Sequence, residues 1–363
     1  MQHIRSVLDQ RRGDSTPAKA LSLLLAAATV LVTSESVAGQ SAGQYVAHPS
    51  TQSPERLVTL GVLADWAEEY NNWGRWGPDD QRGTLNLITP EKTRQATSLV
   101  REGRTVNLHH NPIKHTGSDT GGFGENVHRM ARIDPETGQV GAALDIIQLS
   151  LHDGLHSHLD ALCHYQKTVD GERVIFNGYP ANLSAAGCQD LAIDKMGPGY
   201  VTRGVLVDMP LLKGVDWLEP STPIYVEDLE EWERYAGITM GPGDALLIRS
   251  GRWAKRAAEG PWAYGQGGAG VHASVIPWLA ERDVAVLISD AVNDVQPSGV
   301  EGINRPIHTH TQVELGLPIV DNAYLEDAAE LADELDRWEF MFTLHIMQLR
   351  GATAAPFSAL ATF

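Results

Sequence analysis

Basic residues are scarce in this 363-residue chain. It contains 28 Lys and Arg against 46 Asp and Glu, which gives a formal net charge of −18 at pH 7. Binding a nucleic acid requires a basic surface, and holding a protein on anionic lipid requires a polybasic segment. The composition therefore argues against both as partners, and we expect a small-molecule substrate instead.

Long apolar runs are scarce as well. The apolar run Ala20–Val32 has 13 residues, and no later stretch reaches the roughly 18 that a membrane helix needs. Basic residues precede this run and small residues, Ser36 to Ala38, follow it, which is typical of a signal peptide. We expect residues 1–38 to be cleaved near Ala38, so that the protein is exported to the periplasm or the extracellular space without a membrane segment. An uncleaved anchor and a buried helix are the alternatives.

Only two cysteines are present, Cys163 and Cys188. In an exported protein they could form a disulfide, but their spacing does not require one. A free, buried Cys163 is an equally good interpretation at this point.

The chain contains no obvious linker or internal repeat. Residues 39–55 are polar and rich in turn formers, and we interpret them as a flexible leader before a single domain at 56–363. Alternating apolar runs and helical patterns predict an α/β class, with a mixed β-sheet flanked by helices. Strands are expected at Arg104–His109, Ala142–Leu151, Gly204–Met209, Asp244–Arg249, Val284–Ser289 and Phe340–Leu349. Helices are expected at Val58–Tyr70, Thr89–Glu102, Val226–Ala236, Ala273–Arg282 and Leu325–Leu335.

Histidine, in contrast, is abundant, with 14 in the chain and four of them between Leu151 and Tyr165. In an extended strand, residues of equal parity share one face, so His158 and Asp160 can bind one ion. His152 and His156 have the same parity, and a turn could bring His164 back. Imidazole and carboxylate ligands suit Zn²⁺, Mn²⁺ or Fe²⁺. A histidine-rich strand with each ring bonded to backbone carbonyls is the alternative.

The spacing His158-x-Asp160-x-x-x-His164 resembles part of the H-x-G-T-H-x-D-x-P-x-H signature of the cyclase family. That family includes bacterial kynurenine formamidase and isatin hydrolase. The segments Trp76–Asn86, Asn177-Gly178 and Gly351–Pro356 are also similar to it. The resemblance implies a swivelling β/β/α fold, a homodimer, and one or two divalent ions, with zinc or manganese as the expected metal.

The resemblance also implies roles for individual residues. His158, Asp160 and His164 match the metal ligands of the motif. His308 and Asp321 match the residues that complete the site, although Asp321 stands where many relatives have Glu. If only one ion binds, His164 and His308 are free to act as catalytic acid and base; if two bind, they are ligands.

One position departs from the family pattern. The first motif histidine should lie four residues before His158, where this chain has Gly154. His156 could replace it directly, or His152 could do so if the chain bulges. His310, two residues beyond His308, could exchange roles with it.

These features together predict an exported hydrolase that cleaves a C–N amide bond, in an aryl formamide or a cyclic amide, through a metal-activated water. The same site could instead open a lactone or catalyse a cyclisation or dehydration. A secreted metal-binding protein without catalysis is the third possibility.

Overall fold

The computed structural model describes residues 56–112, 118–119, 127–131, 136–138, 144–263 and 267–363. The expected signal peptide at 1–38 and the leader at 39–55 lie outside the described residues. Within the described part, no helix is both long and apolar enough to cross a membrane.

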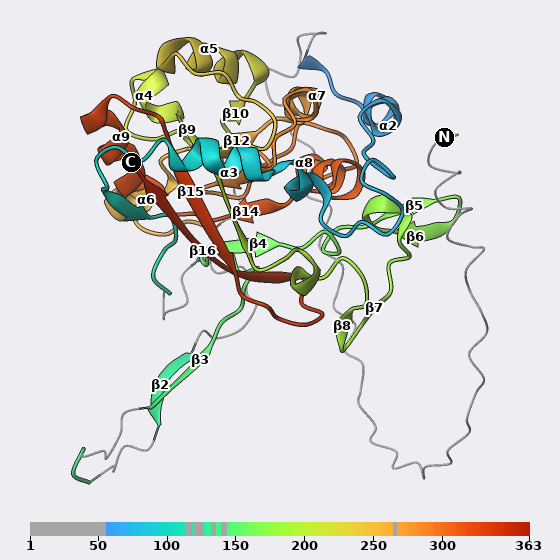
Figure 1. Ribbon diagram of the computed structural model, residues 1–363, viewed down its shortest axis with the longest axis horizontal. Coiled ribbons are helices and arrows are strands. Elements are labelled where there is room, and N and C mark those ends of the chain that lie inside the picture. The colour runs from blue at the N-terminus through green and yellow to red at the C-terminus, as the bar shows by residue number, and fades with distance from the viewer. Residues whose placement is uncertain (1–55, 113–117, 120–126, 132–135, 139–143, 264–266) are drawn as a thin grey trace.

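The core is one mixed β-sheet, which confirms the predicted α/β class (Figure 1). Its centre is parallel, because β11 (Ala245–Arg249) pairs with β9 (Gly199–Asp208) and β13 (Val286–Ser289), and β13 pairs with β14 (Ile319–Asp321). These strands are buried on both faces and consist of short apolar runs, as parallel strands require. In order across the sheet, the strands are β1 (Thr105–Asn107), β16 (Ala354–Thr362), β15 (Glu339–Ile346), β9 (Gly199–Asp208), β11 (Ala245–Arg249), β13 (Val286–Ser289), β14 (Ile319–Asp321) and β4 (His158–Asp160).

Strand β16 closes this sheet on itself. Its later residues pair with β15 and β1, while Ala354 to Pro356 pair antiparallel with β4. Since β4 also pairs with β14, the mixed sheet forms a barrel-like ring. This closure places β4 between β14 and β16.

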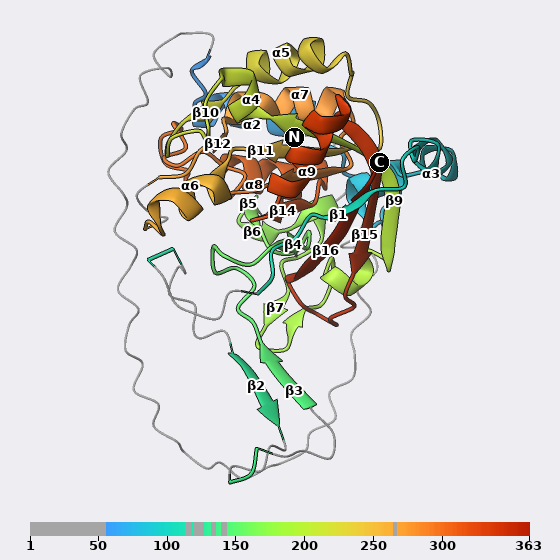
Figure 2. The ribbon, with the colours of Figure 1, turned by 90° about the vertical axis from the view of Figure 1, so that its left-hand side faces the viewer.

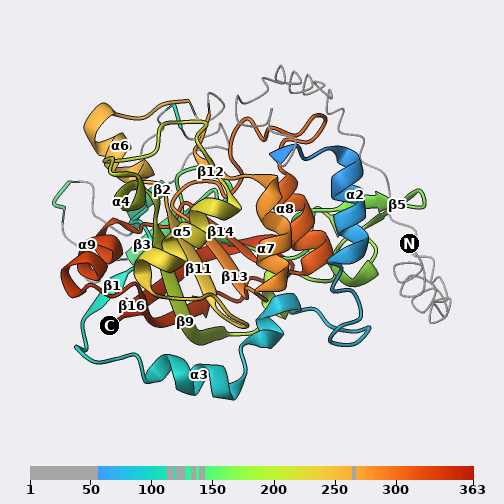
Figure 3. The same cartoon turned by 90° about the horizontal axis from the view of Figure 1, so that it is seen from above.

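Helices cover the outside of the sheet. Figure 3 shows α5 (Val226–Ala236) and α7 (Ile276–Glu281) lying across the central strands, and Figure 2 shows α3 (Pro90–Thr97) beside β9. The α-helices are α2 (Leu60–Glu69), α3 (Pro90–Thr97), α4 (Met209–Lys213), α5 (Val226–Ala236), α6 (Arg252–Glu259), α7 (Ile276–Glu281), α8 (Pro306–His310) and α9 (Glu326–Leu335). Short 3-10 helices are η3 (Gly83–Leu87), η4 (Phe176–Gly178), η5 (Ile193–Lys195) and η7 (Ala273–Val275), and η8 (Thr311–Leu315) is a π-helix.

Several short strand pairs lie outside the ring, and one of them projects from the body. The hairpin of β2 (Val127–Ala131) and β3 (Leu144–Gln148) extends away from the sheet (Figures 1 and 2). The strand expected at Ala142–Leu151 therefore ends at Gln148 and does not join the central sheet. The other pairs are β5 (Lys167–Val169) with β6 (Glu172–Val174), β7 (Leu183–Ser184) with β8 (Gly187–Cys188), and β10 (Pro223–Ile224) with β12 (Gly270–Val271).

The structure corrects one expected helix end and decides between the two alternatives left open for the cysteines. The helix expected to reach Glu102 ends at Thr97, because the hydroxyls of Thr97 and Ser98 donate to the carbonyls of Arg94 and Gln95 and compete with the helix ladder. The cysteines are not free, since Cys163 and Cys188 form a disulfide with Cα atoms 6.5 Å apart. The disulfide joins the chain just after β4 to the β7–β8 hairpin.

Candidate metal centre

Strand β4 carries the first two site residues, His158 and Asp160, on one face. Its antiparallel register sets Asp321 of β14 opposite His158, and Ala354 of β16 opposite Asp160. All of β4 is buried. The sheet itself therefore brings His158, Asp160 and Asp321 together, as the strand parity and the family resemblance predicted.

The residues before β4 do not continue the strand, so the prediction of one extended face from His152 to Asp160 is wrong. Asp153 turns the chain, because its Oδ1 accepts the backbone N–H groups of Leu155 and His156 at 2.9 and 3.0 Å. Its Oδ2 lies 2.7 Å from Nδ1 of His156. His156 is thereby held by Asp153 and does not join the cluster around Asp160.

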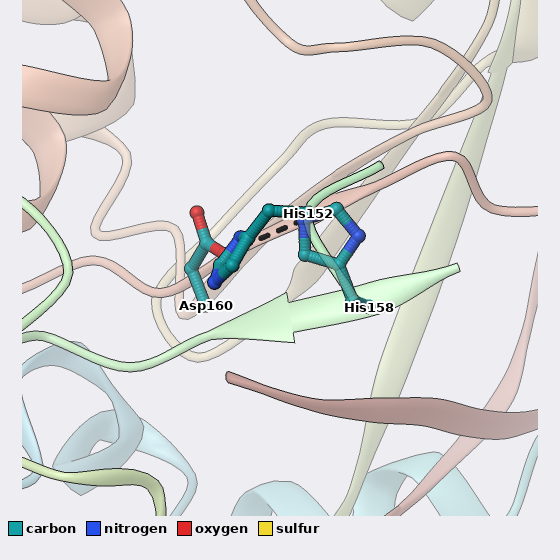
Figure 4. A group of neighbouring side chains, drawn as sticks. All are labelled: His152, His158 and Asp160. Carbon is teal, nitrogen blue, oxygen red and sulfur yellow. Dashed lines mark ion pairs between the residues drawn. The ribbon is translucent and has the colours of Figure 1, made fainter. Parts of the chain in front are cut away.

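His152 takes the position that Gly154 leaves open. Side-chain ligand atoms of His152, His158 and Asp160 all lie within 4.8 Å of one another (Figure 4). Nδ1 of His152 is 3.4 Å from Oδ1 of Asp160, and Nε2 of His158 is 3.6 Å from the same oxygen. Gly154 itself has φ of +81°, and a Cβ there would lie 2.8 Å from the carbonyl oxygen of Asp119. The tight turn at this glycine is what carries His152 into the cluster.

The hydrogen bonds of His158 and Asp160 leave the ligand atoms available for an ion. Nδ1 of His158 donates to the carbonyl of His156 at 2.8 Å, which leaves Nε2 as the lone-pair nitrogen. Gln312 donates to Oδ2 of Asp160 at 3.0 Å, whereas the buried Oδ1 accepts no hydrogen bond among the described residues. A buried carboxylate oxygen without a donor is costly, and a cation bound there would satisfy it. These residues therefore fit a divalent metal.

A second group of predicted residues adjoins the same carboxylate. Nε2 of His164 and Nε2 of His308 each lie 3.8 Å from Oδ2 of Asp160. Nε2 of His308 is also 3.3 Å from Oδ2 of Asp321. All five predicted site residues thus converge, with Asp160 at the centre.

Two residues that follow β13 orient this second group. Nδ1 of His308 bonds to the carboxylate of Asp294, so its Nε2 faces Asp160 and Asp321. Asn293 donates its backbone N–H and its side-chain amide to Oδ1 of Asp321, at 3.1 and 2.7 Å. Neither residue was predicted from the sequence, and nor was Gln312. Polar residues after the carboxyl end of a buried parallel strand were the signal that could have indicated Asn293 and Asp294.

His310 lies apart from the cluster. On the same segment as His308, its Nδ1 is 3.7 Å from Oε2 of Glu314. Lys167 forms a partly buried ion pair with the other oxygen of Glu314. The proposed exchange of roles between His308 and His310 therefore finds no support in this geometry.

The surroundings of the cluster favour neutral imidazoles at His152 and His164, and a charged pair at His308 and Asp321. Burial lowers the pKa of His152 to about 4 and also lowers the pKa of His164. Burial alone would lower the pKa of His308, but Asp321 holds it well above its ordinary value. Burial would likewise raise the pKa of Asp321, yet His308 keeps it below its usual range. Neutral imidazole is the form that binds metal, so His152 and His164 are ready for an ion near neutral pH.

Access to the cluster is one-sided. The side chains of His152 and His164 are 30% and 26% exposed, while Asp160 is 2% exposed. The rings of His152 and His164 stack with centroids 4.1 Å apart. A substrate would therefore approach past these two stacked rings.

Comparisons with known proteins bear on the family and on the fold of the chain. The Cyclase family model matches residues 105–293. A crystal structure described as a novel cyclase is 27% identical, covers 82% of this chain and 99% of its own, and superposes with a TM-score of 0.70. An isatin hydrolase bound to the product analogue thioisatinate is 16% identical, with coverage of 73% and 93% and a TM-score of 0.51, which supports a shared fold alone. No curated protein matches the chain.

Proposed function

Because the chain belongs to the cyclase family, we propose that it is a metal-dependent hydrolase whose metal is held by His152, His158 and Asp160. The observation that carries the proposal is the convergence of three ligand atoms within 4.8 Å on a carboxylate oxygen that accepts no other described hydrogen bond. Two imidazoles and one carboxylate suit zinc or manganese. His164, His308 and Asp321 would hold a second ion, or would remain free for acid and base work.

We propose that the bond cleaved is a C–N amide, in an aryl formamide or a cyclic amide. A divalent ion at this site would supply a Lewis acid that polarises the carbonyl and acidifies water. His164 lies on the exposed side of the cluster, where its lowered pKa suits a base that accepts the proton of the attacking water. His308, whose Nδ1 is bonded to Asp294, can return a proton to the departing nitrogen. The exposure of His152 and His164 supports a small substrate that enters from their side.

Chelation and substrate range test this proposal together. The protein is stripped with a chelator, reloaded with zinc or manganese, and assayed on formanilide, a cyclic imide and a lactone. Amide turnover that disappears with the metal and returns with it is the expected result. Turnover by the metal-free protein would contradict metal dependence. Turnover of the lactone alone would show that the enzyme cleaves esters rather than amides. Tight metal binding without any turnover would favour a metal-binding protein without catalysis.

The proposal also includes export and self-association. Disulfides persist in oxidising compartments, so the Cys163–Cys188 bond supports a periplasmic or extracellular location. An isolated two-stranded hairpin is marginally stable in water, yet the β2–β3 hairpin projects from the body with Ile147 61% exposed. A second copy of the chain that covers this hairpin would fit the homodimer that the family resemblance implies. Fractionation of expressing cells and light scattering of the purified protein test the two points.

A further inference from the structure

Tyr165 is a chemically capable residue beside the metal centre to which none of the roles above is assigned. It follows His164 directly, and its ring meets the His164 ring edge-on with centroids 4.8 Å apart. On its other side it lies against His308, with ring centroids 5.1 Å apart. Tyr165 thus contacts both residues proposed to move protons.

The Tyr165 ring packs between the His164 and His308 rings, at the edge of the cluster. Charged groups close enough to act on its phenol include His308, Asp160 and Asp294, which form or orient the candidate metal centre. The residue is only partly buried, like His152 and His164 on the open side of the cluster. Tyr165 therefore stands at the boundary between the buried carboxylates and the approach route of the substrate.

The hydroxyl of Tyr165 has no structural task that would explain it. No described residue makes a hydrogen bond to this hydroxyl. It is also not one of the fully buried polar atoms, so it is accessible to solvent. The hydroxyls of Tyr70 and Tyr200, in contrast, donate to Glu281 and to the carbonyl of Met196. A phenylalanine would serve equally well if packing against the two histidines were the only function.

We propose that the Tyr165 hydroxyl is a catalytic hydrogen-bond donor to the carbonyl oxygen of the substrate amide, where negative charge develops as water adds. The inference rests on the proposed hydrolase function and deepens it. A phenol is protonated at neutral pH and needs no proton transfer for this role, so the water, the departing nitrogen and the two histidines retain their own steps. A fixed donor aimed at a developing oxyanion contributes more in the transition state than in the ground state, which raises kcat more than it lowers KM.

The test is Tyr165→Phe in the metal-loaded protein, with Tyr235→Phe as the matched control. Tyr235 lies on α5, is 56% exposed, and its ring contacts Trp232 of the same helix. On formanilide, we expect kcat to fall roughly 10- to 100-fold in Tyr165→Phe, with KM within about threefold and with unchanged metal stoichiometry. The control should retain the wild-type kcat.

A binding measurement separates this inference from the proposed function. Formate is a product of formanilide hydrolysis and carries the charged oxygens that the phenol would contact. Calorimetric titration of metal-loaded protein with formate should show roughly tenfold weaker binding in Tyr165→Phe than in wild type, whether or not any amide is turned over. Absence of wild-type turnover would contradict the hydrolase proposal alone.

Three results would overturn the role of Tyr165. The first is equal kcat and equal formate affinity in wild type and Tyr165→Phe. The second is a loss of activity that accompanies loss of metal, which would show that the hydroxyl supports the ligands. The third is a fall in Tm of more than a few degrees in Tyr165→Phe, which would show a structural hydrogen bond.

Discussion

The two sides of the metal centre are built by different means. His158, Asp160 and Asp321 lie on paired strands, and the register of β4 with β14 and β16 determines where their side chains point. His152 and His164 lie on turns on either side of β4, and local hydrogen bonds together with the disulfide hold them. On the buried side, strand pairing fixes the positions of the side chains. On the exposed side, small changes in a loop can alter which side chain reaches Asp160. This difference explains how the chain can place His152 beside Asp160 although the family pattern expects the histidine at position 154.

The largest expected effect comes from removing a ligand on each side. His158→Ala should lower metal affinity by roughly 1000-fold or more, because the strand backbone cannot move to supply another ligand. His152→Ala should lower it only 10- to 100-fold, since the turn can rearrange and water can take its place. Metal titration with a competing chelator gives both values.

His345→Ala, on an exposed position of β15, is the control and should bind metal as wild type does. Equal losses in His158→Ala and His152→Ala would show that the turn is as rigid as the sheet.

A smaller effect is expected from Arg252, which connects the two sides. Its buried guanidinium donates to the carbonyl of Gly154 and to the side chain of Asn322. Arg252→Met leaves both acceptors without this donor, so the free energy of unfolding should fall by about 2–3 kcal/mol. Metal affinity should also fall roughly tenfold, because the Gly154 turn that carries His152 loosens. Urea denaturation and metal titration measure the two effects.

Arg94→Met is the control for the change of residue type, because Arg94 is 68% exposed and should alter stability by less than about 0.5 kcal/mol. A stability loss in Arg252→Met with unchanged metal affinity would mean that the turn holds His152 without Arg252.

Removing the disulfide should affect the stability of the exposed side more than its chemistry. Cys188→Ser opens the bond that fixes the chain just before His164, and we expect a loss of about 2–4 kcal/mol in the free energy of unfolding. Metal affinity should change less than threefold, because β4 holds His158 and Asp160. The same stability loss should follow from reduction of the wild-type protein. A large fall in metal affinity would place His164 among the essential ligands.

The smallest effect on the metal centre itself is expected at the far end of the segment that carries His308, where pH changes stability. Burial raises the pKa of Glu314 to about 7, above its unfolded value near 4.5. The folded protein therefore binds an extra proton between these values, and Glu314 makes stability fall as the pH rises from 4.5 through 7. Relative to Glu314→Gln, the wild type should lose at most about 3 kcal/mol between pH 5 and pH 8. Thermal unfolding of both metal-free proteins across this range gives the difference.

Lys167→Met should steepen this dependence, because the ammonium lowers the pKa of Glu314. A difference between wild type and Glu314→Gln that does not vary with pH would contradict the shifted pKa.

Much of the fold was predictable because local signals agreed with the final structure. The helix at Val226–Ala236 has the expected bounds, and the buried apolar runs became the parallel strands β9, β11 and β13. Strand β14 was not predicted, because a strand of three residues is too short to show an alternating hydrophobic pattern. Strand β16 was missed although its buried and exposed residues alternate, and with it the closure of the sheet, which depends on pairing between distant segments.

For the site, the cluster residues were predictable from the sequence, but the residues that support them were not. Residue types and spacing indicated His158, Asp160 and His164, and the family resemblance added His308 and Asp321. Spacing could not decide between His152 and His156, because the outcome depends on where the Asp153 side chain finds its hydrogen bonds. The supporting residues Asn293, Asp294 and Gln312 come from other parts of the chain, and only tertiary structure brings them to the ligands.

The closure of the sheet by β16 has a consequence for how the protein becomes active. The contacts that complete the cluster span long stretches of chain: Gln312 meets Asp160 across 152 residues, and Thr353 meets His152 across 201. Such distant pairings form late in folding, since each must overcome the entropy of closing a long loop. A partly folded chain can therefore expose separate histidines but not a finished site, and metal acquisition becomes a reporter of complete folding.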